Sequence, residues 1–141
     1  MFSRTYTEGR RGFSATRPKT VELPEDDAVA MNTICSLIHF QPLKNGAQQL
    51  SNADLFNVCV VADKYDCVAA VRYSFLNCNA IPLNDNYKDM MRLLASAYLV
   101  KDRFTFRSVS QHIVRNFAHV ELKTPAACQD RLPERICGML P

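Results

Sequence analysis

The strongest constraint on the fold is a helix-start signal in the middle of the chain. Ser51 and Asp54 are three residues apart, the spacing at which a serine caps a helix and an acidic side chain completes the capping box. Leu50 and Leu55 flank this pair at the spacing of a hydrophobic staple. Apolar residues then recur at helical spacing, at Leu55, Val58, Cys59 and Ala62. The segment therefore predicts an amphipathic helix that buries one face against other elements.

The same helical period recurs along the rest of the chain. Asp26 or Asp27 is placed to cap a helix that ends near Gln41. Asp66 and Thr105 are placed to cap two more helices, and residues 86–101 predict another. The apolar stripes of these helices are Ala30-Ile34-Leu37-Ile38, Val68-Val71-Phe75-Cys78, Tyr87-Met91-Leu94-Tyr98 and Phe106-Val109-Ile113-Phe117.

Three segments depart from this period. Residues 20–23 form a short β-prone run that Pro24 stops, which predicts one short strand. Residues 119–132 show no pattern and are predicted to be irregular. Pro133 and Glu134 are typical of the first turn of a helix, which would be short. The expected fold class is mainly α, with a small α+β remnant.

Length and composition fit one domain, or one domain with an appendage. The chain has 141 residues, of which 48% are hydrophobic and 22% charged, as is ordinary for a globular protein with a buried core. No apolar run reaches the roughly 20 residues that span a bilayer. The N-terminus has no basic-then-apolar signal peptide. We therefore expect an intracellular protein, cytoplasmic or nuclear, with no membrane partner.

Positive charge is concentrated near the N-terminus. Residues 1–20 hold five basic side chains and one acidic one, whereas the whole chain has a net charge of +3. A basic stretch can attract nucleic acid or acidic lipid. Its aromatic residues, Tyr6 and Phe13, are too sparse to predict a base-stacking surface. We expect a solvated loop, and a nucleic-acid-associated regulatory protein is the less favoured alternative.

The six cysteines do not form a zinc or disulfide pattern. None are spaced as CxxC, and no histidine lies at a zinc-like interval. Cys35, Cys59, Cys67 and Cys78 fall within segments of helical apolar pattern, where a free thiol acts as a small hydrophobic group. Without a secretory signal we expect reduced, buried thiols. The sequence predicts no metal and no cofactor.

Catalytic motifs are absent from the sequence. It contains no GxSxG, no GxGxxG and no phosphate-binding glycine loop, and only four glycines in all. The acidic cluster at residues 25–27 is typical of helix capping, since carboxylates favour the positive end of a helix. We therefore predict a non-enzymatic protein with no catalytic residue. Stacked amphipathic helix pairs commonly serve as binding platforms.

Two strings give the chain a family resemblance. The first is KTVELPEDDAVAMNTICSLIHFQ, and after a loop follows LSNADLFNVCVVADKYDCVAAVRYSFLN. Together they resemble BTB/POZ proteins, most closely the large family found in fungi, in which LPEDD leads into a helix and an ADKYD-like segment joins the next two helices. The match covers residues 19–77 well and continues more loosely through residues 86–117 and LPERI. The resemblance implies a protein–protein interaction scaffold.

The resemblance also implies a domain division. Residues 1–80 correspond to the C-terminal half of a BTB/POZ fold with one short strand, and residues 81–141 to a post-BTB extension of helix pairs. The strand hairpin and the helix that open a BTB fold have no counterpart in this sequence, so we expect a truncated domain. Several core strands and much of the family's usual dimer surface would then be absent, so a homo-oligomer is possible but would lack most of that surface. A genuine short form, whose helices cover their exposed face in another way, is the alternative to truncation. A non-functional fragment is a further alternative.

One short segment resembles a partner-binding motif of the family. Tyr6-Thr7-Glu8 matches the apolar-x-Glu segment of BTB domains that recruit a cullin ubiquitin-ligase scaffold. The resemblance implies that Tyr6 and Glu8 contact the cullin and that the chain is a substrate adaptor of the ligase. The alternative is an ordinary loop with an exposed glutamate.

Overall fold

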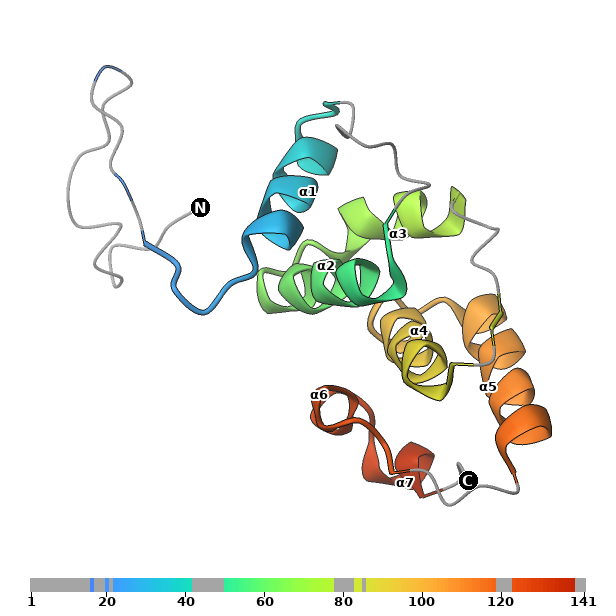
Figure 1. Ribbon diagram of the computed structural model, residues 1–141. Coiled ribbons are helices and arrows are strands. Elements are labelled where there is room, and N and C mark those ends of the chain that lie inside the picture. The colour runs from blue at the N-terminus through green and yellow to red at the C-terminus, as the bar shows by residue number, and fades with distance from the viewer. Residues whose placement is uncertain are drawn as a thin grey trace.

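The computed structural model describes residues 16, 20, 22–41, 50–77, 83, 84, 86–118 and 123–138. Within these ranges the chain is mainly helical, as the apolar period predicts, and has no strand. Figure 1 shows α4 in the middle of the fold, with α1, α2 and α3 grouped above it and α6 and α7 below it. The elements are α1 (Ala28–Ile38), α2 (Asn52–Lys64), α3 (Val68–Asn77), α4 (Tyr87–Leu99), α5 (Arg103–Phe117), α6 (Ala126–Gln129) and α7 (Glu134–Cys137).

Helix α4 is the centre of the core. It packs against α2 on one side and α5 on another, and α6 also contacts it (Figure 1). A helix with neighbours on several sides must be apolar nearly all round. Its fully buried side chains accordingly include Met90, Met91, Leu93, Leu94, Ala95 and Ala97. Because α2 and α4 share this core, the helices on either side of residue 80 pack directly together, and the domain division stays a prediction.

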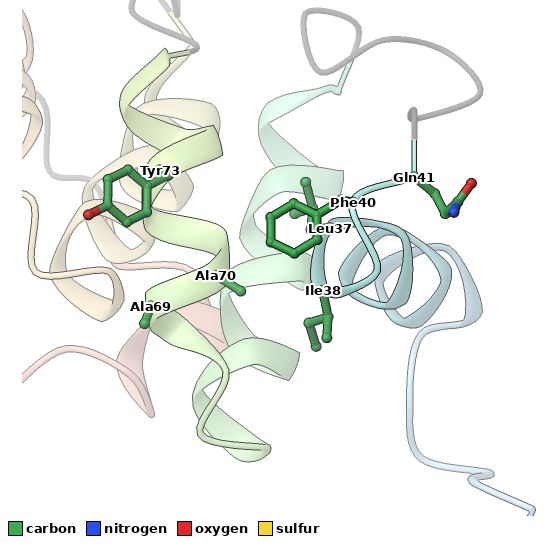
Figure 2. Close-up of a pocket in the computed structure, with 7 residues that line it drawn as sticks. All are labelled: Leu37, Ile38, Phe40, Gln41, Ala69, Ala70 and Tyr73. Carbon is green, nitrogen blue, oxygen red and sulfur yellow. The ribbon is translucent and has the colours of Figure 1, made fainter.

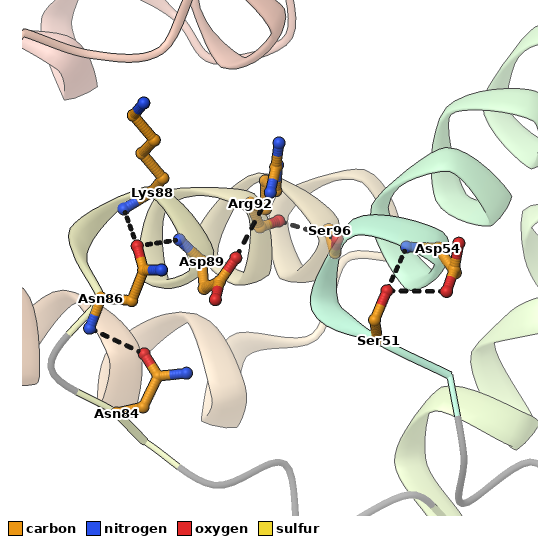
Figure 3. A network of polar contacts seen from close by, with 8 residues as sticks. All are labelled: Ser51, Asp54, Asn84, Asn86, Lys88, Asp89, Arg92 and Ser96. Atoms are coloured by element: carbon orange, nitrogen blue, oxygen red, sulfur yellow. Dashed lines mark hydrogen bonds and ion pairs between the residues drawn. The ribbon is translucent and has the colours of Figure 1, made fainter.

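Helix starts follow the local capping chemistry. The Ser51 hydroxyl accepts a hydrogen bond from the Asp54 N–H at 3.1 Å and donates to the Asp54 carboxylate at 2.6 Å, as Figure 3 shows. Asp27 caps α1 by accepting from the Ala30 N–H at 2.8 Å. Asn86 caps α4 by accepting from the Lys88 N–H at 3.0 Å. The capping predicted at Ser51 and Asp27 is confirmed.

Three helices end in the same turn, a Schellman motif. At the end of α1 the Gln41 N–H donates to the Ser36 carbonyl at 2.8 Å, and the Phe40 N–H donates to the Leu37 carbonyl at 3.2 Å. The left-handed residue of this turn, usually glycine, is Phe40 after α1 (φ 52°), Asp66 after α2 (φ 55°) and Lys101 after α4 (φ 58°).

Two predicted caps are wrong because of these turns. Asp66 is the left-handed residue that closes α2, so α3 begins only at Val68. Asp102 caps α5 in place of Thr105, since its carboxylate accepts from the Phe104 N–H at 3.1 Å. The Asp102 N–H also donates to the Ala97 carbonyl at 2.9 Å and thereby closes α4. One residue therefore ends one helix and starts the next.

The predicted strand at residues 20–23 is wrong for the residues that the structure describes. Thr20, Glu22 and Leu23 are irregular and exposed, and Val21 lies outside the described residues. An extended segment becomes a strand when a neighbouring strand accepts and donates its backbone hydrogen bonds. The described ranges hold no such neighbour, so only the mainly α part of the expected fold class is observed.

Three further predictions are corrected. Tyr98 is 40% exposed, and its ring packs only at the edge of the core, 6.3 Å from the ring of Phe106. Cys35 is exposed, since α1 buries only the face that carries Ala30 and Ile34. Residues 126–129 form α6 inside the stretch predicted to be irregular, and this turn buries Cys128.

Candidate protein interaction surface

An apolar groove lies between α1 and α3. Its volume is about 790 Å³, and none of the described residues that line it carries a charge. Figure 2 shows the side chains of both walls and of the turn that follows α1. We call this surface the α1/α3 groove; its main lining residues are Leu37, Ile38, Phe40, Ala69, Ala70 and Tyr73. A groove of this size is within the range of sites that bind ligands or partner side chains.

Phe40 is the most unusual residue of the groove. Its side chain is 95% exposed, and its backbone is left-handed with φ of 52°. For an L-residue this conformation costs about 1–2 kcal/mol, and for a bulky residue it is uncommon. Burial of the ring cannot offset that cost, because almost none of the ring is buried. The Schellman turn therefore holds an exposed aromatic ring in a strained conformation.

The α3 wall complements this ring. Tyr73 is 75% exposed, and Figure 2 shows its ring and that of Phe40 on the two sides of the groove. Ala69 and Ala70 supply small side chains on α3, one turn from Tyr73. Small residues let another backbone approach closely, and exposed aromatic residues supply large apolar contact area. The arrangement can receive apolar side chains from another polypeptide.

A polar contact joins the N-terminal end of α1 to the C-terminal end of α2. The Lys64 ammonium donates to one oxygen of Asp26 at 2.7 Å, and the Tyr65 hydroxyl donates to the other at 2.5 Å. These hydrogen bonds lower the pKa of the Asp26 carboxyl and raise the pKa of both donors. Asp26 belongs to LPEDD, whereas Lys64 and Tyr65 belong to ADKYDC. The two segments that carry the family resemblance therefore meet in space.

The residues predicted to bind a partner, Tyr6 and Glu8, lie outside the described residues. The apolar stripe of α1 predicts instead that Leu37 and Ile38 are buried. The structure leaves Ile38 42% exposed and Leu37 only partly buried. Phe40 carried a signal that could have been used, because it occupies the position after a helix where glycine is usual.

A second hollow differs from the α1/α3 groove because charged side chains line it. It has a volume of about 340 Å³ and lies where the C-terminal ends of α2 and α4 approach α6. Acidic and basic side chains both line it, at Asp63, Lys101, Asp130 and Arg131. Opposite charges of this kind at an exposed surface are typical of solvated side chains.

The thiols differ in burial and reactivity. All five described cysteines are unpaired, and burial raises the pKa of Cys59 to about 12 and of Cys128 to about 11. Such thiols are poor nucleophiles at neutral pH. Among the described residues, no three His, Cys, Asp or Glu side chains gather closely enough to hold a metal ion.

None of the described helices combines the length and the apolar character needed to cross a membrane. Comparisons with protein-family models, with curated proteins and with solved structures found no match. The BTB/POZ resemblance therefore stays a prediction from the two strings that carry it.

Proposed function

We propose that this chain is a non-enzymatic protein–protein interaction module of the BTB/POZ type, and that the α1/α3 groove is its partner-binding surface. The observation that supports the proposal is the strained and exposed Phe40 ring facing Tyr73 across an apolar groove. Backbone strain in a folded protein is concentrated at ligand clamps and other functional sites. A fold without a role for this ring would be more stable with glycine at position 40.

The occupant that the groove favours is an amphipathic helix of a partner protein. Two helices form its walls, and an additional helix can lay an apolar stripe between them. None of the described residues that line the groove is charged, so an inserted stripe that is uncharged suits it best, because a buried charge would find no partner among them. Ala69 and Ala70 allow the backbone of that helix to come close to α3.

The proposal is tested with displayed helical peptides. A library of amphipathic helices is selected on the purified chain, and the Kd of each selected peptide is measured by fluorescence anisotropy. Ala69→Glu places a charge on the exposed α3 wall and should weaken binding at least about tenfold. Ala28→Glu changes an exposed alanine of α1 outside the groove and should leave the Kd unchanged. Selected peptides that bind Ala69→Glu as tightly as the unmodified chain would refute the groove.

The role of substrate adaptor for a cullin ubiquitin ligase is a separate part of the proposal. It rests on Tyr6-Thr7-Glu8 alone. Glu8→Lys should abolish co-precipitation with the purified N-terminal region of a cullin, and Glu22→Lys, at an exposed glutamate elsewhere, should not. If the unmodified chain fails to bind any cullin tested, the adaptor role is refuted and the groove proposal stands on its own test.

A further inference from the structure

Helix α5 carries a solvent face with two arginines near its start and one near its end. Arg103, Arg107 and Arg115 are all exposed, and α5 contains no aspartate or glutamate. At 100° per residue the three fall within an arc of about 120°, and Arg103 and Arg115 are about 18 Å apart along the axis. Positive charge is therefore aligned on one side of one helix.

These charges are not compensated within the described part of the chain. The two ion pairs described there join Lys64 to Asp26 and Arg92 to Asp89, and neither involves α5. The acid nearest in sequence, Asp102, is 4% exposed and uses its carboxylate to cap α5. Like charges four residues apart destabilise a helix by a few tenths of a kcal/mol. The repulsion between Arg103 and Arg107 therefore persists in the folded chain, and a bound partner of opposite charge would remove it.

Apolar side chains lie on the same face. Phe104 is 86% exposed and Val114 is 48% exposed, and both fall within the arc of the three arginines. Aromatic and arginine side chains are enriched at protein–protein interfaces and supply much of their binding energy, and both kinds are exposed side by side here. We call this surface the α5 basic face; its residues are Arg103, Phe104, Arg107, Val114 and Arg115.

We infer that the α5 basic face binds an acidic segment of a partner protein that also offers an apolar side chain to Phe104. Carboxylates spaced along about 18 Å would pair with the arginine forks, which match carboxylate geometry in a bidentate manner. A polypeptide is favoured over nucleic acid, because the whole chain has a net charge of only +3 and an aliphatic Val114 offers nothing to stacked bases. This surface is formed by a different helix from those that line the α1/α3 groove, so the module would hold two partners.

The test uses defined probes on the full chain. The first is a fluorescein-labelled peptide of alternating Glu and Leu or Phe residues, the second is the same peptide with Gln in place of Glu, and the third is a duplex DNA. At low salt the Glu peptide should bind, the Gln peptide should bind at least about tenfold more weakly, and added salt should weaken the Glu peptide. Duplex DNA that binds more tightly than the Glu peptide and displaces it would overturn the inference in favour of a nucleic-acid surface.

Substitutions in the α5 basic face test whether the Glu peptide binds there. Arg107→Glu, and the triple change of Arg103, Arg107 and Arg115 to Glu, should progressively abolish binding of the Glu peptide. Phe104→Ala should weaken it about tenfold, as for an interface aromatic residue. Ala69→Glu, in the α1/α3 groove, should not change it. These side chains are exposed, so circular dichroism should show an unchanged helical fold. Equal binding by the triple variant and the unmodified chain would overturn the inference.

Discussion

The left-handed backbone at Phe40 makes an unusual prediction, that one substitution stabilises the fold and removes its binding. Phe40→Gly keeps the Schellman turn, because glycine adopts positive φ without a steric cost. It also deletes the aromatic ring from the α1/α3 groove. Stability and affinity should therefore change in opposite directions.

The size of the stability gain follows from two opposing effects. Relief of the left-handed conformation gains about 1–2 kcal/mol, because the Cβ no longer meets the following carbonyl oxygen. Glycine also gives the unfolded chain more freedom, which costs about 0.5–1 kcal/mol. The ring is 95% exposed, so its removal forfeits almost no burial. The net gain lies within about 0–1.5 kcal/mol and is centred on about 0.75 kcal/mol, which raises the midpoint of thermal unfolding by roughly 3 °C.

The assay combines thermal unfolding, followed by circular dichroism, with the Kd of a selected helical peptide. Two controls separate the effects. Phe40→Ala keeps the strain of an L-residue, so it should lose binding with little change in stability. Lys101→Gly relieves the same backbone conformation after α4, where φ is 58°, so it should gain stability and keep binding. If Phe40→Gly lowers the unfolding midpoint, the ring is part of the packing and the reasoning is refuted.

Three further predictions concern charge and core. Asp26→Asn should lower the unfolding midpoint at neutral pH, because it weakens the contacts with Lys64 and Tyr65. The pKa of Asp26 in the folded chain lies below 3.8, so the stability that its carboxylate contributes is present above pH 3.8 and is lost as the pH falls through the lowered pKa. The unmodified chain should therefore lose more stability than the variant between about pH 5 and about pH 2. Burial raises the pKa of the Cys59 thiol from 9.0 to about 12, so the stability that the neutral thiol contributes is complete below pH 9 and is lost as the pH rises to 12. Urea titrations at pH 8 and pH 11 should show that the unmodified chain loses on the order of 3 kcal/mol more free energy of unfolding than Cys59→Ala, and equal losses would contradict this. Leu94→Ala opens a cavity at a fully buried position of α4 and should lower the free energy of unfolding by about 3 kcal/mol, and a loss below about 1 kcal/mol would show that the core collapses around it.

Local chemistry explains which parts of the fold could be predicted. The Ser51 cap and the stripe through Val109 and Ile113 depend on residues a few positions apart, and the structure agrees with both. The prediction at Asp66 and Thr105 failed, because capping residues also suit turns and a Schellman motif shifts the next helix start. Neither error changes the order of the helices, since the apolar periods on each side are long.

The sequence by itself determined that the longer helices α1 to α5 form and that they must stack, because apolar periods act within one element. The tertiary structure decided which apolar side chains stay uncovered, since that depends on which other helices arrive. Asp26 meets Lys64 at the end of α2 across 38 residues of chain, and the packing of α1 beside α3 places Phe40 and Tyr73 at one groove. Only the packing of α5 against α4 decided that its arginines point to solvent without an acidic partner among the described residues.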